Sequence, residues 1–177
     1  MLLLLALIGG LAGAFKPDIA MILGSGLGVL AEAVSPVAAR ISYGDIPHMA
    51  QSTVEGHSGE LVLGQLAGRN VAVLSGRVHA YEGHPFDRLV YPLRLMARLG
   101  CETLVVTNAC GGINTDFVPG DIMLITDHIN MLGSNPLVGP NDASLGPRFP
   151  DMSTAYCPRL RSKALAAADS VSHGWLM

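Results

Sequence analysis

Short runs of apolar residues, each closed by glycine or polar residues, constrain the fold of this chain more than any other feature. They occupy residues 19–23, 60–68, 69–76, 102–109 and 121–129, and runs of this length and composition predict buried strands. Strands this apolar, with segments of helical period between them, favour a mainly parallel sheet that is covered on both faces. We therefore expect an α/β fold with a mainly parallel, twisted central sheet flanked by helices.

Two segments have the apolar spacing of helices. Residues 30–34 follow a glycine-rich turn, and in residues 87–100 apolar side chains recur every three or four positions. Asp87 is expected to cap this second helix and Gly100 to end it. Pro92 should kink the helix or mark its first turn, because proline has no backbone N–H to donate.

A single domain over residues 1–177 is expected, because no internal repeat or low-complexity linker divides the chain. Residues 132–150 form a long loop rich in Gly, Pro and Asn, and loops of this length are often functional. Residues 1–14 are atypically apolar and uncharged. They are too short to span a bilayer and lack the basic start of a secretory signal, so we expect a helix, or part of one, packed on the core.

Charge and cysteine content exclude several classes of partner. The formal net charge is -3 and the 11 basic residues are dispersed, so neither nucleic acid nor a membrane is an expected partner. The 3 cysteines lack C-x-x-C spacing. They predict free thiols in a reducing, cytoplasmic compartment rather than a disulfide framework or a metal site.

The first predicted strand runs into the turn GSGLGV, in which Gly24 and Gly26 flank Ser25. Glycines in a strand-to-helix turn let backbone N–H groups approach an anion, and Ser25 adds a hydroxyl. A tight turn that merely needs glycine explains the motif equally well. Val29 stands where a dinucleotide fingerprint has glycine or alanine, and no Gly-Lys-Ser/Thr follows. Both facts disfavour a dinucleotide site and a P-loop.

Ionisable groups gather in the stretch LSGRVHAYEGHP, directly after a predicted strand. If that strand continues through the stretch, alternation places Arg77, His79 and Tyr81 on one face. Arg77 can hold a phosphate through two parallel hydrogen bonds. A plain ion pair between Arg77 and Glu82 is the alternative, but clustering at a strand end favours a binding site.

The motif TNACGGIN ends another predicted strand and leaves residues 108–112 with small side chains. Backbone N–H groups there are open to a phosphate oxygen or to the edge of a flat ring. Ligands of open α/β sheets bind beyond the carboxyl ends of the strands, and three strand ends in this chain carry Gly-rich or polar motifs. The residues therefore predict a phosphate-handling site at this edge of the sheet.

These motifs, in this order and spacing, closely resemble those of the trimeric purine nucleoside phosphorylases. The resemblance runs from about Phe15 to about Asp169 and rests on ILGSGLG, STVEGHSGELVLG, GRVHAYEGHP, LVVTNACGGIN, GDIMLITDHIN, NPLVGPND and RFPDMSTAY. It implies reversible phosphorolysis of purine (deoxy)ribonucleosides to the free base and (deoxy)ribose 1-phosphate, in purine salvage. It also implies a homotrimer, phosphate as co-substrate, and no metal or organic cofactor.

The resemblance assigns roles to individual residues. The implied phosphate ligands are Ser25, His57, Arg77, His79 and the backbone of Ala109. The implied nucleoside contacts are Tyr81 toward the ribose, Ala109, Cys110 and Gly111 around the purine, and Phe149 toward the sugar in a neighbouring subunit's site. Glu82 would hold the arginine and the histidine, and the three side chains make up the implied catalytic group.

Later segments of the family, which hold the purine and stabilise the departing base, do not occur in these 177 residues. We expect a C-terminally truncated, partial domain with an exposed hydrophobic edge and little or no phosphorylase activity. The residues that select between 6-oxo and 6-amino purines fall in those segments. A methylthioadenosine phosphorylase-like enzyme and a noncatalytic phosphate-binding fragment are the alternatives.

Overall fold

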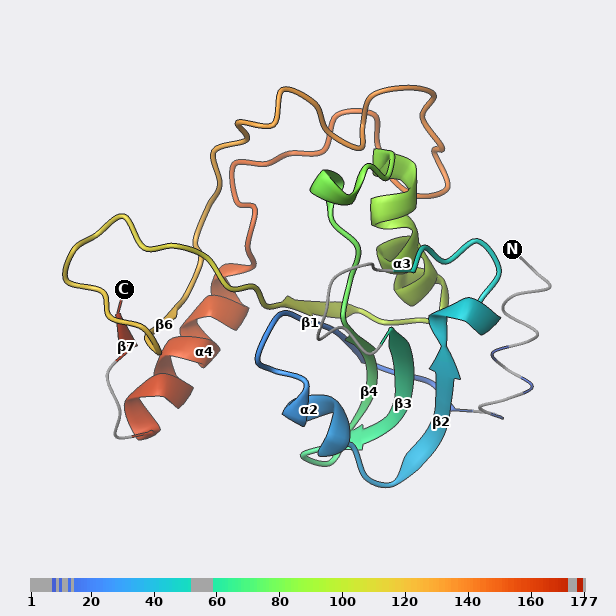
Figure 1. Ribbon diagram of the computed structural model, residues 1–177, viewed down its shortest axis with the longest axis horizontal. Coiled ribbons are helices and arrows are strands. Elements are labelled where there is room, and N and C mark those ends of the chain that lie inside the picture. The colour runs from blue at the N-terminus through green and yellow to red at the C-terminus, as the bar shows by residue number, and fades with distance from the viewer. Residues whose placement is uncertain are drawn as a thin grey trace. The chain divides into compact units, whose positions relative to one another are not determined.

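The computed structural model describes residues 15–51, 59–171 and 175–176, together with residues 8, 10 and 13 (Figure 1). It divides into two compact units, residues 1–109 and residues 110–177. The expectation of a single domain stays a prediction. The helix expected over residues 1–14 falls largely outside the described residues, and the implied phosphate ligand His57 lies wholly outside them.

The first unit contains a five-stranded sheet in the order β2-β3-β4-β1-β5. Its strands are β1 (Ile19–Leu23), β2 (Val37–Ser42), β3 (Glu60–Leu66), β4 (Arg69–Ser75) and β5 (Thr103–Val106). Strand β1 pairs in parallel with β4 and β5, whereas β3 pairs antiparallel with β2 and β4. The α/β class is confirmed, but the sheet is mixed rather than mainly parallel. A two-residue link, residues 67–68, joins β3 to β4, and a link that short permits only antiparallel pairing.

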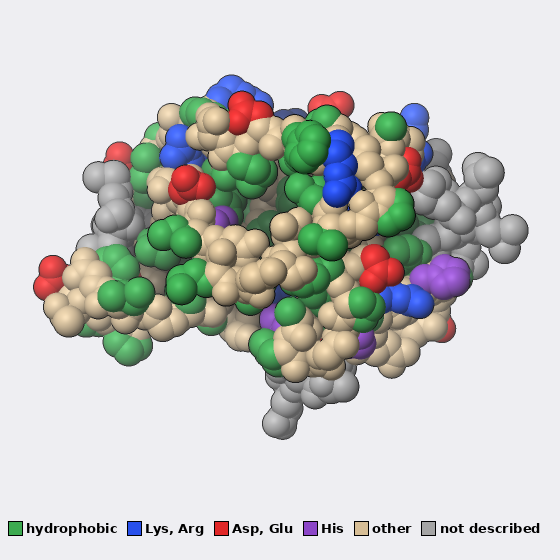
Figure 2. Space-filling view, turned by 90° about the horizontal axis from the view of Figure 1, so that it is seen from above, with side chains coloured by type: hydrophobic (Ala, Val, Ile, Leu, Met, Phe, Trp, Pro, Cys, Tyr) green, Lys and Arg blue, Asp and Glu red, His purple; other side chains and the backbone are tan. Residues whose placement is uncertain are grey.

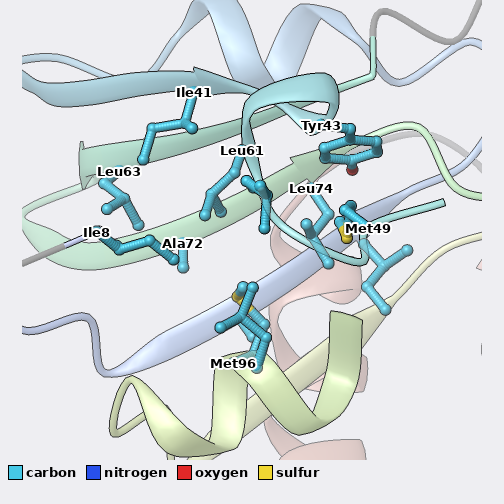
Figure 3. Packing of buried hydrophobic residues seen from close by; sticks show 13 residues of the cluster. Ile8, Ile41, Tyr43, Met49, Leu61, Leu63, Ala72, Leu74 and Met96 are labelled. Carbon is cyan, nitrogen blue, oxygen red and sulfur yellow. The ribbon is translucent and has the colours of Figure 1, made fainter. Parts of the chain in front are cut away.

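Helices α2 (Val29–Glu32) and α3 (Phe86–Arg98) cover opposite faces of this sheet. On one face Leu95 and Met96 of α3 belong to a buried cluster, in which Met96 points toward the strands (Figure 3). The strand residues of that cluster are Ala20, Ile22, Ile41, Leu61, Leu63, Ala72 and Leu74. On the other face Ala31 of α2 packs with the strand residues Leu23, Val62, Val71 and Val73. Alternate residues of β1, β3 and β4 thus supply two cores, which explains why these three strands read as continuous apolar runs.

Helix α3 confirms one of its predicted boundary signals, corrects another and decides between the two alternatives for Pro92. Gly100 follows the C-cap residue, Leu99, with φ 98° and ends the helix as expected. Asp87 is not the cap, because Pro85 holds that position and Asp87 lies in the first turn. Pro92 lies inside the helix rather than in its first turn. Burial of Leu95 and Met96 offsets the hydrogen bond that Pro92 cannot donate.

Tyr43 joins the ends of two strands. Tyr43 begins the short 3-10 helix η1 (Tyr43–Asp45), which directly follows β2. The residue itself is only 3% exposed. Its hydroxyl donates a hydrogen bond of 2.8 Å to the carbonyl oxygen of Gly76, the residue after β4. Burial, with a smaller contribution from Glu60, raises the pKa of the Tyr43 phenol, so that it remains a donor at neutral pH.

Strand β5 forms one edge of the sheet and carries apolar side chains that are only half covered. Leu104, Val105 and Val106 are 42%, 40% and 44% exposed. An exposed hydrophobic edge was expected from the sequence, and β5 confirms it. Among the described residues, the only strand that pairs with β5 is β1.

The second unit has little regular structure. It contains α4 (Pro158–Ser170) and a two-stranded parallel sheet of β6 (Ile122–Met123) and β7 (Trp175–Leu176). The strand predicted over residues 121–129 is therefore wrong in length, since only Ile122–Met123 forms a strand. This strand pairs with β7 and not with the central sheet. The apolar side chains of this segment are exposed, with Ile122 at 55%, so burial does not stabilise a longer strand here. The predicted loop over residues 132–150 is confirmed. In the described part of the chain no helix is long and apolar enough to cross a membrane.

Replacing Tyr43 with phenylalanine tests the link between the two strand ends. Tyr43→Phe leaves the buried carbonyl of Gly76 without its donor, so the free energy of unfolding should fall by about 1 to 3 kcal/mol. Tyr91→Phe is the matched control, because the hydroxyl of Tyr91 donates to the carbonyl of Pro47 at an exposed position. It should cost less than about 1 kcal/mol. Urea unfolding measures the free energy of unfolding of both variants. Equal losses would contradict a special role for the buried bond from Tyr43 to Gly76.

Candidate functional site

The register of the parallel strands brings three polar strand ends to one edge of the sheet. Leu23 of β1 lies opposite Ser75 of β4, and Ile22 lies opposite Val106 of β5. The turn with Ser25, the stretch that begins at Arg77, and residues 107–109 therefore leave the sheet side by side. This edge is where open α/β sheets bind ligands.

The turn after β1 packs directly against the end of β5. Gly24 N–H donates to Oγ1 of Thr107 at 2.8 Å. A Cβ on Gly24 would lie 2.8 Å from both the carbonyl oxygen of Thr107 and the Cα of Asn108, closer than side-chain carbons approach other atoms. Glycine is therefore required at this position. The next residue, Ser25, is exposed at the tip of the turn and open to a ligand.

Arg77 is anchored at the same edge. Gly76 has φ 97° and turns the chain out of β4, so the strand ends at Ser75 and does not continue through Tyr81. The expected alternation of Arg77, His79 and Tyr81 along one strand is thus wrong. Instead Arg77 folds back, and its Nη1 donates to the carbonyl oxygen of Thr107 at 2.9 Å. In the described part of the chain the Nη2 group makes no hydrogen bond, which leaves it available to an anion.

Glu82 holds His79 in place. It ends the 3-10 helix η2 (Ala80–Glu82), and its side chain is 3% exposed. One carboxylate oxygen accepts the backbone N–H of His79 at 2.7 Å and lies 3.0 Å from Nδ1 of the ring. Since an ionised carboxylate only accepts, the ring carries a proton on Nδ1. The other ring nitrogen, Nε2, lies 3.5 Å from Nε of Arg77.

Tyr81 stacks on the histidine. The two ring centroids are 4.7 Å apart and the planes differ by 12°. Tyr81 itself is 76% exposed. A flat, exposed ring stacked on His79 suits an apolar sugar face.

The remaining predicted residues lie at the end of the first unit or in the second. Ala109, Cys110 and Gly111 are all exposed, and the chain passes from one unit to the other at Ala109. Phe149 belongs to the second unit and is 88% exposed. Exposed hydrophobic side chains are common on the face that Figure 2 shows. The assignment of Cys110, Gly111 and Phe149 to the nucleoside stays a prediction.

An apolar cavity of about 180 Å³ lies beside Arg77 in the first unit. Strand residues Ile22, Leu74 and Val106 and the α3 residue Leu93 contribute to its wall. Arg77 is the only charged side chain among the described residues that line it. The low-polarity wall strengthens the field of the guanidinium toward a bound anion. Within the described ranges, no group of three or more His, Cys, Asp or Glu could hold a metal ion.

Two residues at this edge were not found from the sequence. Thr107 contacts both the Ser25 turn and Arg77, and Tyr43 holds the carbonyl that precedes Arg77. Thr107 had a visible signal, because it is the polar residue that closes the apolar run of β5. Tyr43 had none, since its contact spans 33 positions of the chain.

The fold and this edge define a class: an α/β protein with a candidate anion site where parallel strands end. Comparison with known families is consistent with that class, since the model of the phosphorylase superfamily matches residues 18–173. The chain belongs to the phosphorylase superfamily.

Characterised relatives and solved structures agree with this membership. The chain is 57% identical over 156 residues to purine nucleoside phosphorylase 1 of Geobacillus stearothermophilus, a match that covers 88% of this chain and 57% of the relative. Against the purine nucleoside phosphorylase of Mus musculus it is 50% identical over 156 residues, 86% of this chain and 54% of the relative. The chain therefore spans little more than half the length of these relatives.

Two solved structures have the same fold over nearly the whole chain. A purine nucleoside phosphorylase in complex with ribose-1-phosphate superposes with a TM-score of 0.87 at 43% identity, covering 94% of this chain and 62% of that one. The Schistosoma mansoni enzyme in complex with inosine gives a TM-score of 0.85 at 42% identity, covering 94% and 59%.

Substitution of Glu82 tests its control of the histidine ring. In Glu82→Ala the carboxylate that accepts from Nδ1 is gone, so neutral His79 should shift toward the tautomer protonated on Nε2. Glu82→Gln keeps an acceptor oxygen and should retain the Nδ1–H form. Nitrogen-15 NMR of the imidazole above its titration range distinguishes the tautomers. An unchanged ring in Glu82→Ala would show that other contacts set the tautomer.

Thiol reactivity tests the exposure of the candidate purine-side cysteine. All three cysteines are free, with Cys110 and Cys157 exposed. Burial, with a smaller contribution from Asp18, raises the pKa of Cys101 to about 11. At pH 8 only about one Cys101 in a thousand is then a thiolate. Iodoacetamide followed by peptide mass analysis should modify Cys110 and Cys157 first, and the Cys101 rate should rise about tenfold per pH unit below pH 11. Equal rates for all three would contradict this order.

Proposed function

We propose that this chain carries the phosphate and ribose side of a purine nucleoside phosphorylase. The proposal rests on one observation. Hydrogen bonds hold the Ser25 turn, Arg77 and the His79–Glu82 pair together at the edge of the sheet where the parallel strands end. The names of the relatives and the ligands of the solved neighbours supply the substrate class. The proposed substrates are inorganic phosphate and a purine (deoxy)ribonucleoside, with no metal or organic cofactor.

The proposed reaction joins a phosphate oxygen to C1′ of the sugar as the bond from C1′ to the purine nitrogen breaks. The sugar passes through a state resembling an oxocarbenium ion, and the electron pair of the broken bond leaves with the base. Arg77, His79 and Ser25 would hold the phosphate dianion below C1′, where its charge stabilises the cationic sugar. Tyr81 would cover the ribose. Proton transfer to the departing base needs groups from the family's later segments, which these 177 residues do not contain.

Assembly and cellular role follow from the same proposal. We infer a cytoplasmic enzyme of purine salvage that works as a homotrimer, with Phe149 entering the site of a neighbouring copy. The support is the exposure of Phe149, since a phenylalanine left 88% exposed gains stability when a partner covers it. Sedimentation equilibrium gives the mass of the particle in solution and tests the trimer.

Replacing Arg77 tests the phosphate site. Arg77→Ala removes a charge-assisted hydrogen-bond donor, so phosphate affinity should fall by about 10- to 100-fold. Arg69→Ala is the matched control. Arg69 is the first residue of β4, at the opposite end of the strand from Arg77, and its removal changes the net charge equally. It should leave affinity nearly unchanged. Isothermal titration with inorganic phosphate measures all three proteins, and equal losses in both variants would indicate a nonspecific charge effect.

A coupled assay of inosine phosphorolysis tests what the chain does alone. We expect phosphate binding with little or no release of hypoxanthine, next to a rapid rate from the full-length Geobacillus relative. Comparable rates would show that these 177 residues suffice for catalysis. Titration with hypoxanthine separates the alternatives further, since binding of phosphate without the base favours a noncatalytic phosphate-binding fragment.

A further inference from the structure

Thr107 connects the three strand ends that form the candidate site. We infer that it is a positioning residue, whose hydroxyl fixes the Ser25 turn and whose carbonyl fixes Arg77 in the geometry that receives phosphate. This inference rests on the proposed phosphate site and adds a residue that touches no substrate itself.

The hydroxyl of Thr107 is used in both directions. Oγ1 accepts the backbone N–H of Gly24 at 2.8 Å and lies 3.1 Å from the carbonyl oxygen of Ile22, to which it donates. A threonine hydroxyl has one proton to donate, so the contact with Ile22 fixes its direction and leaves a lone pair for Gly24. These bonds span 83 and 85 positions of the chain. The start of the Ser25 turn is therefore held by β5 and not by local contacts alone.

The backbone carbonyl of Thr107 holds the side chain of Arg77. It accepts Nη1 of Arg77 at 2.9 Å, which orients the planar guanidinium. Because the guanidinium is rigid, fixing Nη1 also fixes the direction of Nη2. One residue thus sets the distance between the exposed Ser25 hydroxyl and the free donor of Arg77, both of which are implied phosphate ligands.

The residue type matters at this position. The three residues before it, Leu104, Val105 and Val106, are apolar, and valine has the same branched shape as threonine. Shape and strand propensity alone would therefore accept valine. Valine would keep the bond from the backbone N–H of residue 107 to the carbonyl oxygen of Ile22, which is 3.0 Å long. The acceptor for the N–H of Gly24 is the hydroxyl of Thr107, which valine lacks. If the residue served only to end β5, its replacement by valine would leave the site unchanged.

A matched set of substitutions tests this role. Thr107→Val removes the hydroxyl and keeps the branched side chain, Thr107→Ser keeps the hydroxyl, and Thr103→Val makes the same change at the other end of β5. Phosphate affinity from isothermal titration should fall by about tenfold or more in Thr107→Val. Thr107→Ser should recover most of it, and Thr103→Val should match the unsubstituted chain. The amide proton of Gly24 should exchange with solvent about tenfold faster in Thr107→Val alone.

The outcomes separate this inference from the proposed function. Absence of phosphate binding in the unsubstituted chain would refute the phosphate site, whereas equal affinity in Thr107→Val and the unsubstituted chain would refute the role of Thr107. Unchanged exchange at Gly24 would refute that role independently of phosphate. If Thr107→Val does not fold, NMR of the unsubstituted chain decides: the Thr107 hydroxyl proton should be visible and close to the Gly24 amide proton, and its absence overturns the inference.

Discussion

The parallel pairing of β1 with β4 and β5 is the constraint on which the rest of the structure depends. Parallel strands end at the same edge, so the register that places Leu23 opposite Ser75 also places Ser25 near Arg77. Two buried clusters, one on each face of the sheet, fix that register, because a slip of one residue would exchange the residues that face α2 and α3. Packing in the core therefore determines the geometry of polar groups that are not in the core.

Buried hydrogen bonds refine what packing establishes. Tyr43 holds the carbonyl of Gly76 before Arg77, and Thr107 holds both Gly24 and the guanidinium. Neither residue carries charge or is a predicted phosphate ligand. They illustrate how the proposed anion site is built: a few ionisable groups lie half-buried at the strand ends, and neutral donors and acceptors behind them fix their positions.

The sequence predicted four of the five strands of the central sheet and missed β2, and it predicted the direction of strand pairing poorly. Apolar runs identified β1, β3 and β4 because burial on both faces leaves a continuous hydrophobic pattern, and they identified β5 although its apolar side chains are half exposed. The same pattern cannot distinguish parallel from antiparallel pairing, which depends on the length of each link. The cluster of ionisable residues after β4 pointed to Arg77, His79 and Glu82, but it did not predict the turn at Gly76 that ends the strand. Thr107 and Tyr43 act through contacts between distant segments, which no local pattern encodes.

The separation in sequence between the parts of the site has a consequence for how the first unit folds. The bonds that join Thr107 to Gly24 and to Ile22 close loops of 83 and 85 positions, which makes them the longest step in assembling this edge. The β3–β4 hairpin needs only a two-residue turn, so it can form early, whereas β5 must dock against β1 across most of the unit. The groups that we propose as anion ligands thus reach their places only when β5 is added. An anion bound there would select chains in which this last strand is in register, and would stabilise them in proportion to its concentration.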